Sequence, residues 1–106
     1  MQDFAKMEAN AQQAVDLLKT LGNRYRLMIL CVLQEKEMSV SELNNMIAIP
    51  QSSLSQHLAW LRREAYVKTR RDAQTIYYSL DSNEVREVIT VLYKLFCQDD
   101  DALLVS

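Results

Sequence analysis

The sequence predicts a mainly α-helical fold completed by one β-hairpin. Apolar residues recur at helical spacing along most of the chain, whereas residues 66–80 alternate apolar and polar side chains on either side of a short turn. The hairpin follows closely on two helices that are separated by a tight turn containing the only proline, Pro50. Helix, turn, helix and hairpin in this order are the layout of a winged helix-turn-helix.

The first predicted helix carries apolar residues at alternating steps of three and four, from Phe4 to Leu21. Such spacing is a heptad stripe, here about three heptads long. Gly22, the only glycine, marks the end of this helix, and Asn23 can cap the next one. The second helix is expected to end near Glu35, and its apolar run LMILCVL predicts burial on every side.

Two further helices form the helix-turn-helix. Ser39 and Glu42 match a capping box that opens a third helix through about Ile47, and Pro50 prevents this helix from continuing. The fourth helix is expected over residues 51–64. Its apolar face, at i, i+4 and i+7, consists of Leu54, Leu58 and Leu61. Polar and basic side chains project roughly opposite, by the 100° step per residue: Ser52, Ser53, Gln56 and Arg63.

The hairpin strands are predicted at residues 66–71 and 75–80, with Ile76, Tyr78 and Leu80 on one face of the second strand. A last helix is expected from about residue 82 to residue 98, again with apolar residues at helical spacing. At 106 residues the chain is expected to form one domain, residues 1–106. Since the first and last helices carry stripes wider than a small core can absorb, we expect a homodimer through these two helices.

The overall charge conceals two regions of opposite sign. The whole chain has a net charge of −2, but residues 50–80 hold five basic and two acidic residues, a local charge of +3. Residues 81–106 hold two basic and six acidic residues, a local charge of −4. A winged helix-turn-helix is a DNA-binding layout, and contacts with DNA phosphates depend on local rather than overall charge. Residues 50–80 are therefore predicted to face DNA. The acidic tail with Asp99, Asp100 and Asp101 is expected to point away from DNA.

Several classes of protein are not indicated. The N-terminus lacks an uninterrupted apolar stretch and no segment approaches 18 apolar residues, so we expect a cytoplasmic protein without a membrane contact. In that compartment the two cysteines are expected to be thiols. The sequence has no nucleophile, base and acid constellation and no glycine-rich phosphate loop. It therefore predicts a chain that is not an enzyme and uses no cofactor.

Candidate DNA-binding residues lie on the outer face of the fourth helix and on the hairpin. Glutamine can form a bidentate hydrogen bond with adenine, serine can bond bases or phosphates, and the basic residues suit phosphate contact. The alternative for these side chains is an ordinary solvated face, and for the lone histidine it is packing. Trp60 is expected to pack against the hairpin. The predicted DNA-binding residues are Ser52, Ser53, Ser55, Gln56, His57, Arg63, Lys68, Arg70 and Arg71.

The motifs LGNRYRLMILCVL, SVSEL, LSQHLAWLRR and TIYYSL, in this order, resemble the ArsR/SmtB family of small dimeric bacterial repressors over residues 10–97. The specific part is LSQHL followed by LRR and a basic hairpin, whereas the terminal helices are generic. The resemblance implies binding to double-stranded operator DNA. It points to the metal-independent branch, because Cys31 and Cys97 stand where those proteins carry paired cysteines.

The sequence also departs from the family pattern. The second helix has one thiol where metal-binding members commonly have Cys-x-Cys, and the last helix has no histidine, so no metal is expected. Ala65 replaces the common glycine between the fourth helix and the hairpin. An alanine at positive φ costs about 1 kcal/mol, so a different turn is expected there. The hairpin tip, residues 72–74, also lacks glycine and leaves its turn type open.

Cys31 and Cys97 permit two interpretations. Each could be a small buried hydrophobic residue, as free cysteines usually are. Alternatively, two thiols on helices that the fold brings together could exchange between the dithiol and a disulfide or polysulfide bridge. The resemblance favours the second interpretation.

The sequence thus predicts a dimeric transcription regulator that binds a pseudo-palindromic operator and is controlled by thiol redox or reactive sulfur species through Cys31 and Cys97. One alternative is a constitutive DNA-binding regulator or anti-silencer whose cysteines are structural. The other is a winged-helix protein-interaction module that has lost DNA binding.

Overall fold

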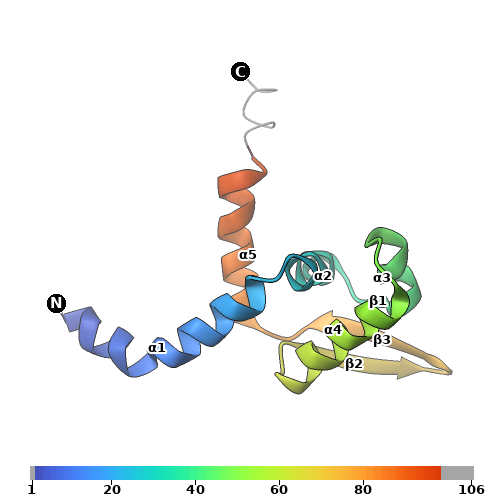
Figure 1. Ribbon diagram of the computed structural model, residues 1–106, viewed down its shortest axis with the longest axis horizontal. Helices are drawn as coiled ribbons and strands as arrows, with labels where there is room; N and C mark the ends of the chain where they lie inside the picture. Colours follow the sequence, from blue (N-terminus) through green and yellow to red (C-terminus); the bar gives the residue numbers. More distant parts are fainter. Residues whose placement is uncertain (1, 99–106) are drawn as a thin grey trace.

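The computed structural model describes residues 2–98, and within them the predicted mainly helical fold with a hairpin wing is confirmed. Figure 1 shows α3, α4 and the sheet gathered at one end, while the first half of α1 and the far end of α5 extend away from them. The acidic run Asp99, Asp100 and Asp101 lies outside the described residues. The elements are α1 (Gln2–Leu21), α2 (Arg24–Glu35), β1 (Met38–Ser39), α3 (Val40–Met46), α4 (Gln51–Arg63), β2 (Val67–Asp72), β3 (Thr75–Leu80) and α5 (Asn83–Phe96).

The predicted caps form as the sequence indicates. The side chain of Asn23 accepts hydrogen bonds from the backbone N–H groups of the first turn of α2. At α3 the capping box is complete: the Glu42 N–H donates to the Ser39 hydroxyl, and the Ser39 N–H donates to the Glu42 carboxylate. Ser82 caps α5 in the same manner by accepting from the Val85 N–H. These polar residues fix the helix boundaries because they satisfy otherwise unpaired N–H groups.

The core lies where α2 meets α4, β3 and α5. The prediction that α2 is buried on every side is wrong for the single chain. Ile29, Leu30 and Leu33 are buried, whereas the neighbouring apolar residues of the helix are only half-buried. One side of α2 therefore lies open toward pockets rather than against the core. The fully buried side chains are Ile29, Leu30, Leu43, Ile47, Leu54, Leu58, Leu61, Ile89, Val85 and Thr20.

The sheet has a third strand that the sequence pattern did not predict. Met38 and Ser39 form β1, which pairs antiparallel with Tyr78 and Tyr77 of β3, so that β3 lies between β1 and β2. A strand of two residues is too short to show a period of two, and Ser39 also serves as the cap of α3. The hairpin is thereby tied to the connection between α2 and α3.

Both glycine-free turns use an alanine in the left-handed region. Ala65 has φ 65°, so the expectation of a different turn there is wrong. The Tyr66 N–H donates to the Leu61 carbonyl and the Ala65 N–H to the Arg62 carbonyl, which is the Schellman pattern that ends a helix. These hydrogen bonds offset the strain. At the hairpin tip Ala73 has φ 58° at the first of two loop residues, the feature of a type II′ turn.

Candidate DNA interface and thiol pocket

Helix α4 buries one face and leaves the other free, as its sequence predicts. Leu54, Leu58 and Leu61 are fully buried against the core. Of the predicted reading residues, Ser52, Ser55, Gln56 and Arg63 are exposed, whereas Ser53 and His57 are half-buried. The structure thus gathers the small polar side chains on the solvent side of one rigid helix.

The turn before α4 is held by a residue that the sequence reasoning missed. The Asn44 side-chain amide donates to the Ile47 carbonyl at 3.2 Å and to the Ile49 carbonyl at 2.8 Å. Pro50 occupies the cap position of α4, and no side chain caps that end among the described residues. The first N–H groups of a helix are unsatisfied by the helix itself, so this end can accept an anion such as a phosphate. An asparagine just before a proline-containing turn was the available signal.

Aromatic and basic side chains from α2 lock α4 in place. The Arg26 guanidinium lies 4.5 Å from the centre of the Trp60 ring and also donates to the Thr20 carbonyl. Trp60 stacks on Tyr66 at a centroid distance of 6.4 Å, which confirms its packing against the start of the hairpin. The His57 ring lies near Tyr25, and its burial, together with the charge of Arg26, lowers the pKa of His57. The imidazole is therefore neutral at pH 7.

The two arginines of the wing have different surroundings. Successive residues of a strand point to opposite faces, so Arg71 shares the face of buried Val67, against which α4 packs, and Arg70 lies on the other face. Arg70 is paired with Glu37 at 2.6 Å, whereas Arg71 has no ion pair within residues 2–98. Lys68 is also exposed on β2. Of the predicted basic contacts, Arg71 and Lys68 are the cations left unpaired on this strand.

The two cysteines line one pocket between α2 and α5. This pocket has a volume of about 250 Å³ and nearly apolar walls. Both cysteines are free thiols; Cys31 is half-buried and Cys97, which caps the C-terminus of α5, is exposed. Burial raises the pKa of the Cys31 thiol, and the proximity of Cys97 raises it further. The lining residues are Leu27, Cys31, Ile89, Leu92, Tyr93, Phe96 and Cys97.

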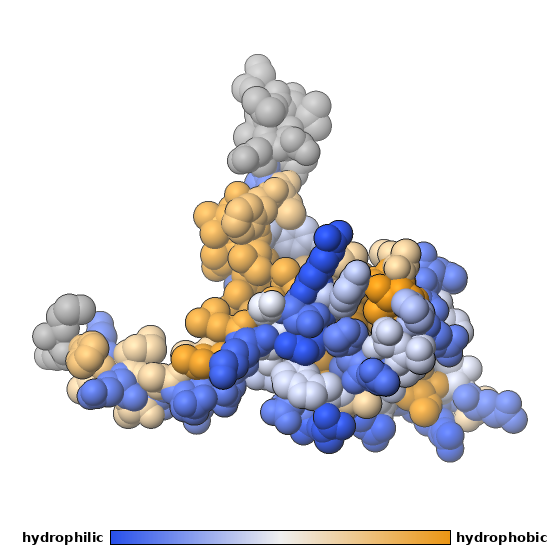
Figure 2. Space-filling model, viewed as in Figure 1, coloured by the Kyte–Doolittle hydropathy of each residue, from blue (hydrophilic) through white to orange (hydrophobic). Residues whose placement is uncertain are grey.

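Helices α1 and α5 expose apolar stripes that no other part of residues 2–98 covers. Leu18 on α1 and Leu95 on α5 are 62 % and 61 % exposed. Figure 2 shows this hydrophobic surface running over α5 and along the adjoining part of α1. The other exposed apolar residues of the two helices are Phe4, Met7, Val15, Val91, Tyr93 and Phe96.

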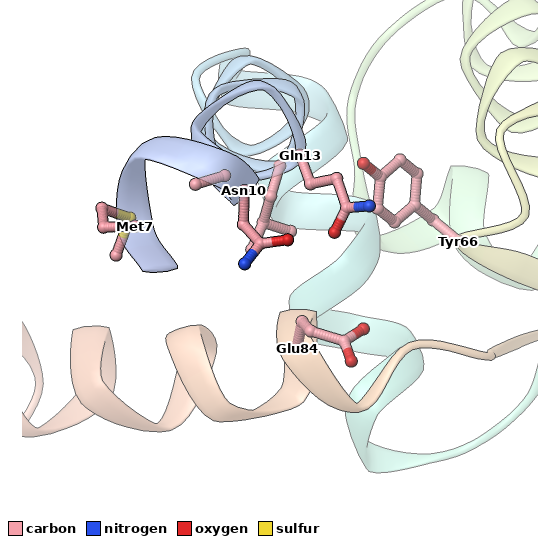
Figure 3. Close-up of a pocket in the computed structure, with 7 residues that line it drawn as sticks. Met7, Asn10, Gln13, Tyr66 and Glu84 are labelled. Atoms are coloured by element: carbon pink, nitrogen blue, oxygen red, sulfur yellow. The ribbon is translucent and has the colours of Figure 1, made fainter. Parts of the chain in front are cut away.

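A pocket of about 490 Å³ opens between α1 and the first turn of α5. Figure 3 shows Gln13 of α1 directed at Tyr66, with Asn10 beside it and Glu84 of α5 across the opening. Its apolar wall includes Met7 of the exposed α1 stripe.

In the described part of the chain no group of three or more His, Cys, Asp or Glu side chains could hold a metal ion. Within the same residues no helix is both long and apolar enough to cross a membrane.

Comparisons with known proteins agree with this geometry. The model of the family described as bacterial regulatory protein, arsR family, matches residues 23–69. The transcriptional activator HlyU of Vibrio cholerae is 52 % identical over 96 residues, which span 91 % of this chain and 89 % of HlyU. The biofilm growth-associated repressor of Xylella fastidiosa is 42 % identical over 94 residues, spanning 89 % of this chain and 82 % of the repressor.

Solved structures show the same fold. Reduced HlyU from Vibrio cholerae superimposes with a TM-score of 0.81 over 88 % of this chain and 98 % of that one, at 52 % identity. The repressor BigR from Xylella fastidiosa gives a TM-score of 0.83 over 88 % of this chain and 95 % of that one, at 42 % identity. These relatives are transcriptional regulators and not enzymes, in agreement with the prediction for this chain.

Proposed function

The chain belongs to the arsR family of bacterial regulatory proteins, and from this premise we propose that it is a homodimeric transcription regulator that binds a pseudo-palindromic operator and responds to thiol oxidation. The observation that carries the DNA-binding part is the exposed polar face of α4 beside a basic wing. The observation that carries the control is the shared pocket of Cys31 and Cys97.

Helix α4 is the proposed reading element. Its uncapped N-terminus would meet a phosphate, which sets the depth of the helix in the major groove. Ser52, Ser53, Ser55 and Gln56 would then face base edges or the adjacent backbone, with His57 and Arg63 at the border of the contact. A neutral His57 contributes a hydrogen-bonding group and no charge.

The exposed stripes of α1 and α5 support the proposed homodimer. Contiguous apolar surface of this kind marks an interface, and two related copies would present two α4 helices to neighbouring major grooves. Because its target is chromosomal DNA, we place the protein in the cytoplasm.

The proposed control converts the two thiols of the pocket into a disulfide or polysulfide bridge. Cys97 is exposed and is the thiol that an oxidant reaches first, and Cys31 would then close the bridge from α2. Closing the bridge would shift α5, which carries part of the proposed dimer interface, relative to α2, which belongs to the core. A coupling of a few kcal/mol is sufficient for such a switch.

One observation favours a second candidate, a constitutive regulator with structural cysteines. Burial raises the pKa of Cys31, and a raised pKa lowers the fraction of reactive thiolate at pH 7. In this reading Cys31 is a packing residue at the edge of the core. The two candidates differ in whether oxidant changes affinity for DNA.

The proposed function is tested with duplex DNA from upstream of the protein's own reading frame. We expect specific binding with an affinity that falls linearly in log–log form as salt increases, and weaker binding in the absence of reductant. An affinity that changes neither with salt concentration nor with the sequence of the duplex would overturn the DNA-binding proposal. An affinity that is the same with and without reductant would favour the constitutive regulator.

A first prediction concerns base readout by Gln56. Because this exposed side chain can bond an adenine edge, Gln56→Ala is expected to weaken operator binding roughly tenfold and to relax the preference at one position in each half-site. A panel of operator duplexes with single base changes measures both effects. The matched control is Gln12→Ala, the same change on α1. Equal affinity and equal preference for the two variants would contradict the prediction.

A second prediction concerns the wing. Arg71 is an unpaired cation on the α4 side of the hairpin, so Arg71→Ala is expected to weaken specific and non-specific binding alike. The slope of log K against log salt should become shallower by about 1 for each lost phosphate contact. Arg86→Ala removes the same charge from an exposed position on α5, outside α4 and the wing, and should leave the slope unchanged. A wild-type slope for Arg71→Ala would remove this residue from the interface.

A further inference from the structure

Glu37 stands at the point where α2 is connected to the sheet. It follows Lys36, whose N–H still donates to the Val32 carbonyl of α2, and it precedes Met38, the first residue of β1. β1 is buried and hydrogen-bonded to β3. Two residues thus join the end of a core helix to the sheet.

The carboxylate of Glu37 reaches across the sheet to the wing strand. Arg70 Nη2 lies 2.6 Å from Glu37 Oε1, and Arg70 Nε lies 3.2 Å and 3.3 Å from the two carboxylate oxygens. This fork geometry fixes direction as well as distance. The hydrogen bonds between the two groups, and after them their opposite charges, hold the pKa of Glu37 below its usual value and raise the pKa of Arg70, so both groups are charged at pH 7.

Tyr77 of β3 completes the cluster. It is the cross-strand partner of Ser39 on one side and of Arg70 on the other. The Arg70 guanidinium lies 4.7 Å from the centre of the Tyr77 ring. Arg70 is therefore held by the Glu37 carboxylate, by Asp72 at 4.0 Å on its own strand and by the Tyr77 ring, on the sheet face opposite α4.

We propose that Glu37 and Arg70 are positioning residues that fasten the wing to the end of α2, so that Arg71 and the hairpin tip meet DNA at a defined angle. This inference rests on the proposed DNA binding and deepens it. Arg70 then acts through the wing's orientation, and Glu37, although negatively charged, supports binding to a polyanion.

The same connection links the wing to the thiol pocket. Cys31 and Tyr93 line that pocket and also a second one of about 290 Å³, whose other walls include Lys36 and Met38. Cys31 on α2 and Lys36 are about one and a half helical turns apart, and Glu37 follows Lys36. A shift of α5 against Cys31 would therefore be transmitted along the end of α2 to Lys36 and Glu37. The ion pair would carry it to β2.

The direction in which Glu37→Ala changes operator affinity distinguishes a positioning role from a purely electrostatic one. Glu37→Ala and Glu64→Ala each remove one negative charge, and Glu64 is an exposed residue at the end of α4 with no ion pair in the described chain. Electrostatics alone predicts that both variants bind DNA slightly more tightly. Positioning predicts that Glu37→Ala binds the operator about fivefold more weakly while Glu64→Ala does not.

Two further arms complete the experiment. In an Arg70→Ala background, the additional change Glu37→Ala should not weaken operator binding any further, because the pair is already broken and only the small electrostatic gain is left. The charge swap Glu37→Arg with Arg70→Glu keeps the net charge and should recover the affinity lost by Arg70→Glu alone. Without recovery, Arg70 would be a direct phosphate contact and the proposal would be wrong.

A readout without DNA distinguishes this inference from the proposed function. Amide hydrogen exchange in β2 should accelerate in Glu37→Ala and stay at the wild-type rate in Glu64→Ala. Equal exchange and equal operator affinity for the two variants would overturn the inference and leave DNA binding intact. A wild-type protein that binds no duplex would refute the proposed function, and the exchange rates would still decide whether Glu37 fastens the wing.

Discussion

Val91→Glu is expected to convert the protein to a monomer and to weaken operator binding by about a hundredfold or more. Val91 lies on the exposed apolar stripe of α5, one turn before Leu95, and is 52 % exposed in the single chain. A carboxylate there leaves the fold of the protomer intact but would be buried without a partner in the dimer. A monomer then holds one half-site and loses the binding energy of the other.

The matched control is Thr90→Glu, which adds the same charge to the next residue of α5 on an exposed side away from the stripe. Sedimentation velocity should give a dimer for Thr90→Glu and a monomer for Val91→Glu at the same concentration. Circular dichroism should give equal helix content for both. A Val91→Glu variant that stays dimeric would exclude this stripe as the interface, and one that is monomeric yet binds the full operator with wild-type affinity would contradict the need for two half-sites.

Most of the fold could be predicted because its signals are local. Leu54, Leu58 and Leu61 mark the buried face of α4 by spacing alone, and Ser39 with Glu42 fixes the start of α3. The strand β1 could not be predicted, because two residues carry no period and its partner β3 is far away in sequence. Ala65 illustrates a cost that local reasoning overestimates, since the backbone hydrogen bonds of the Schellman turn compensate for a positive φ.

The candidate site was predictable in its residue types but not in its pairings. Strand alternation already predicts that Arg70 and Arg71 lie on opposite faces of the hairpin. Only the structure shows that Arg70 forms an ion pair with Glu37. Glu37 belongs to no regular motif, and its distance from Arg70 along the chain gives no signal. Likewise, the burial of the LMILCVL segment depends on which elements pack against α2. In the single chain the side of α2 that carries Cys31 is only half-buried. Tertiary placement, rather than propensity, decides both points.

Oxidation of the thiol pair is expected to lower operator affinity by between tenfold and about a hundredfold, a coupling within the usual allosteric range. Diamide takes up the two protons and two electrons that Cys31 and Cys97 release as their sulfurs join, and mass spectrometry should then find a bridge within one protomer. Cys31→Ser and Cys97→Ser should each bind DNA as the reduced wild type does and lose the response. A persulfide donor should act on the same two residues.

The pocket also predicts how fast the bridge forms. Thiol–disulfide exchange requires a thiolate, and burial with the nearby Cys97 raises the pKa of Cys31, so closure should accelerate as pH rises toward that pKa. Tyr93→Phe keeps the ring that lines the pocket and removes a hydroxyl, so it serves as a control that should still bridge. A bridge needs the two Cα atoms to come within about 7 Å, which requires α5 to move whenever they are farther apart. Absence of an intramolecular bridge, or equal operator affinity before and after it forms, would refute the switch. The constitutive regulator, with Cys31 as a packing residue at the edge of the core, would then stand.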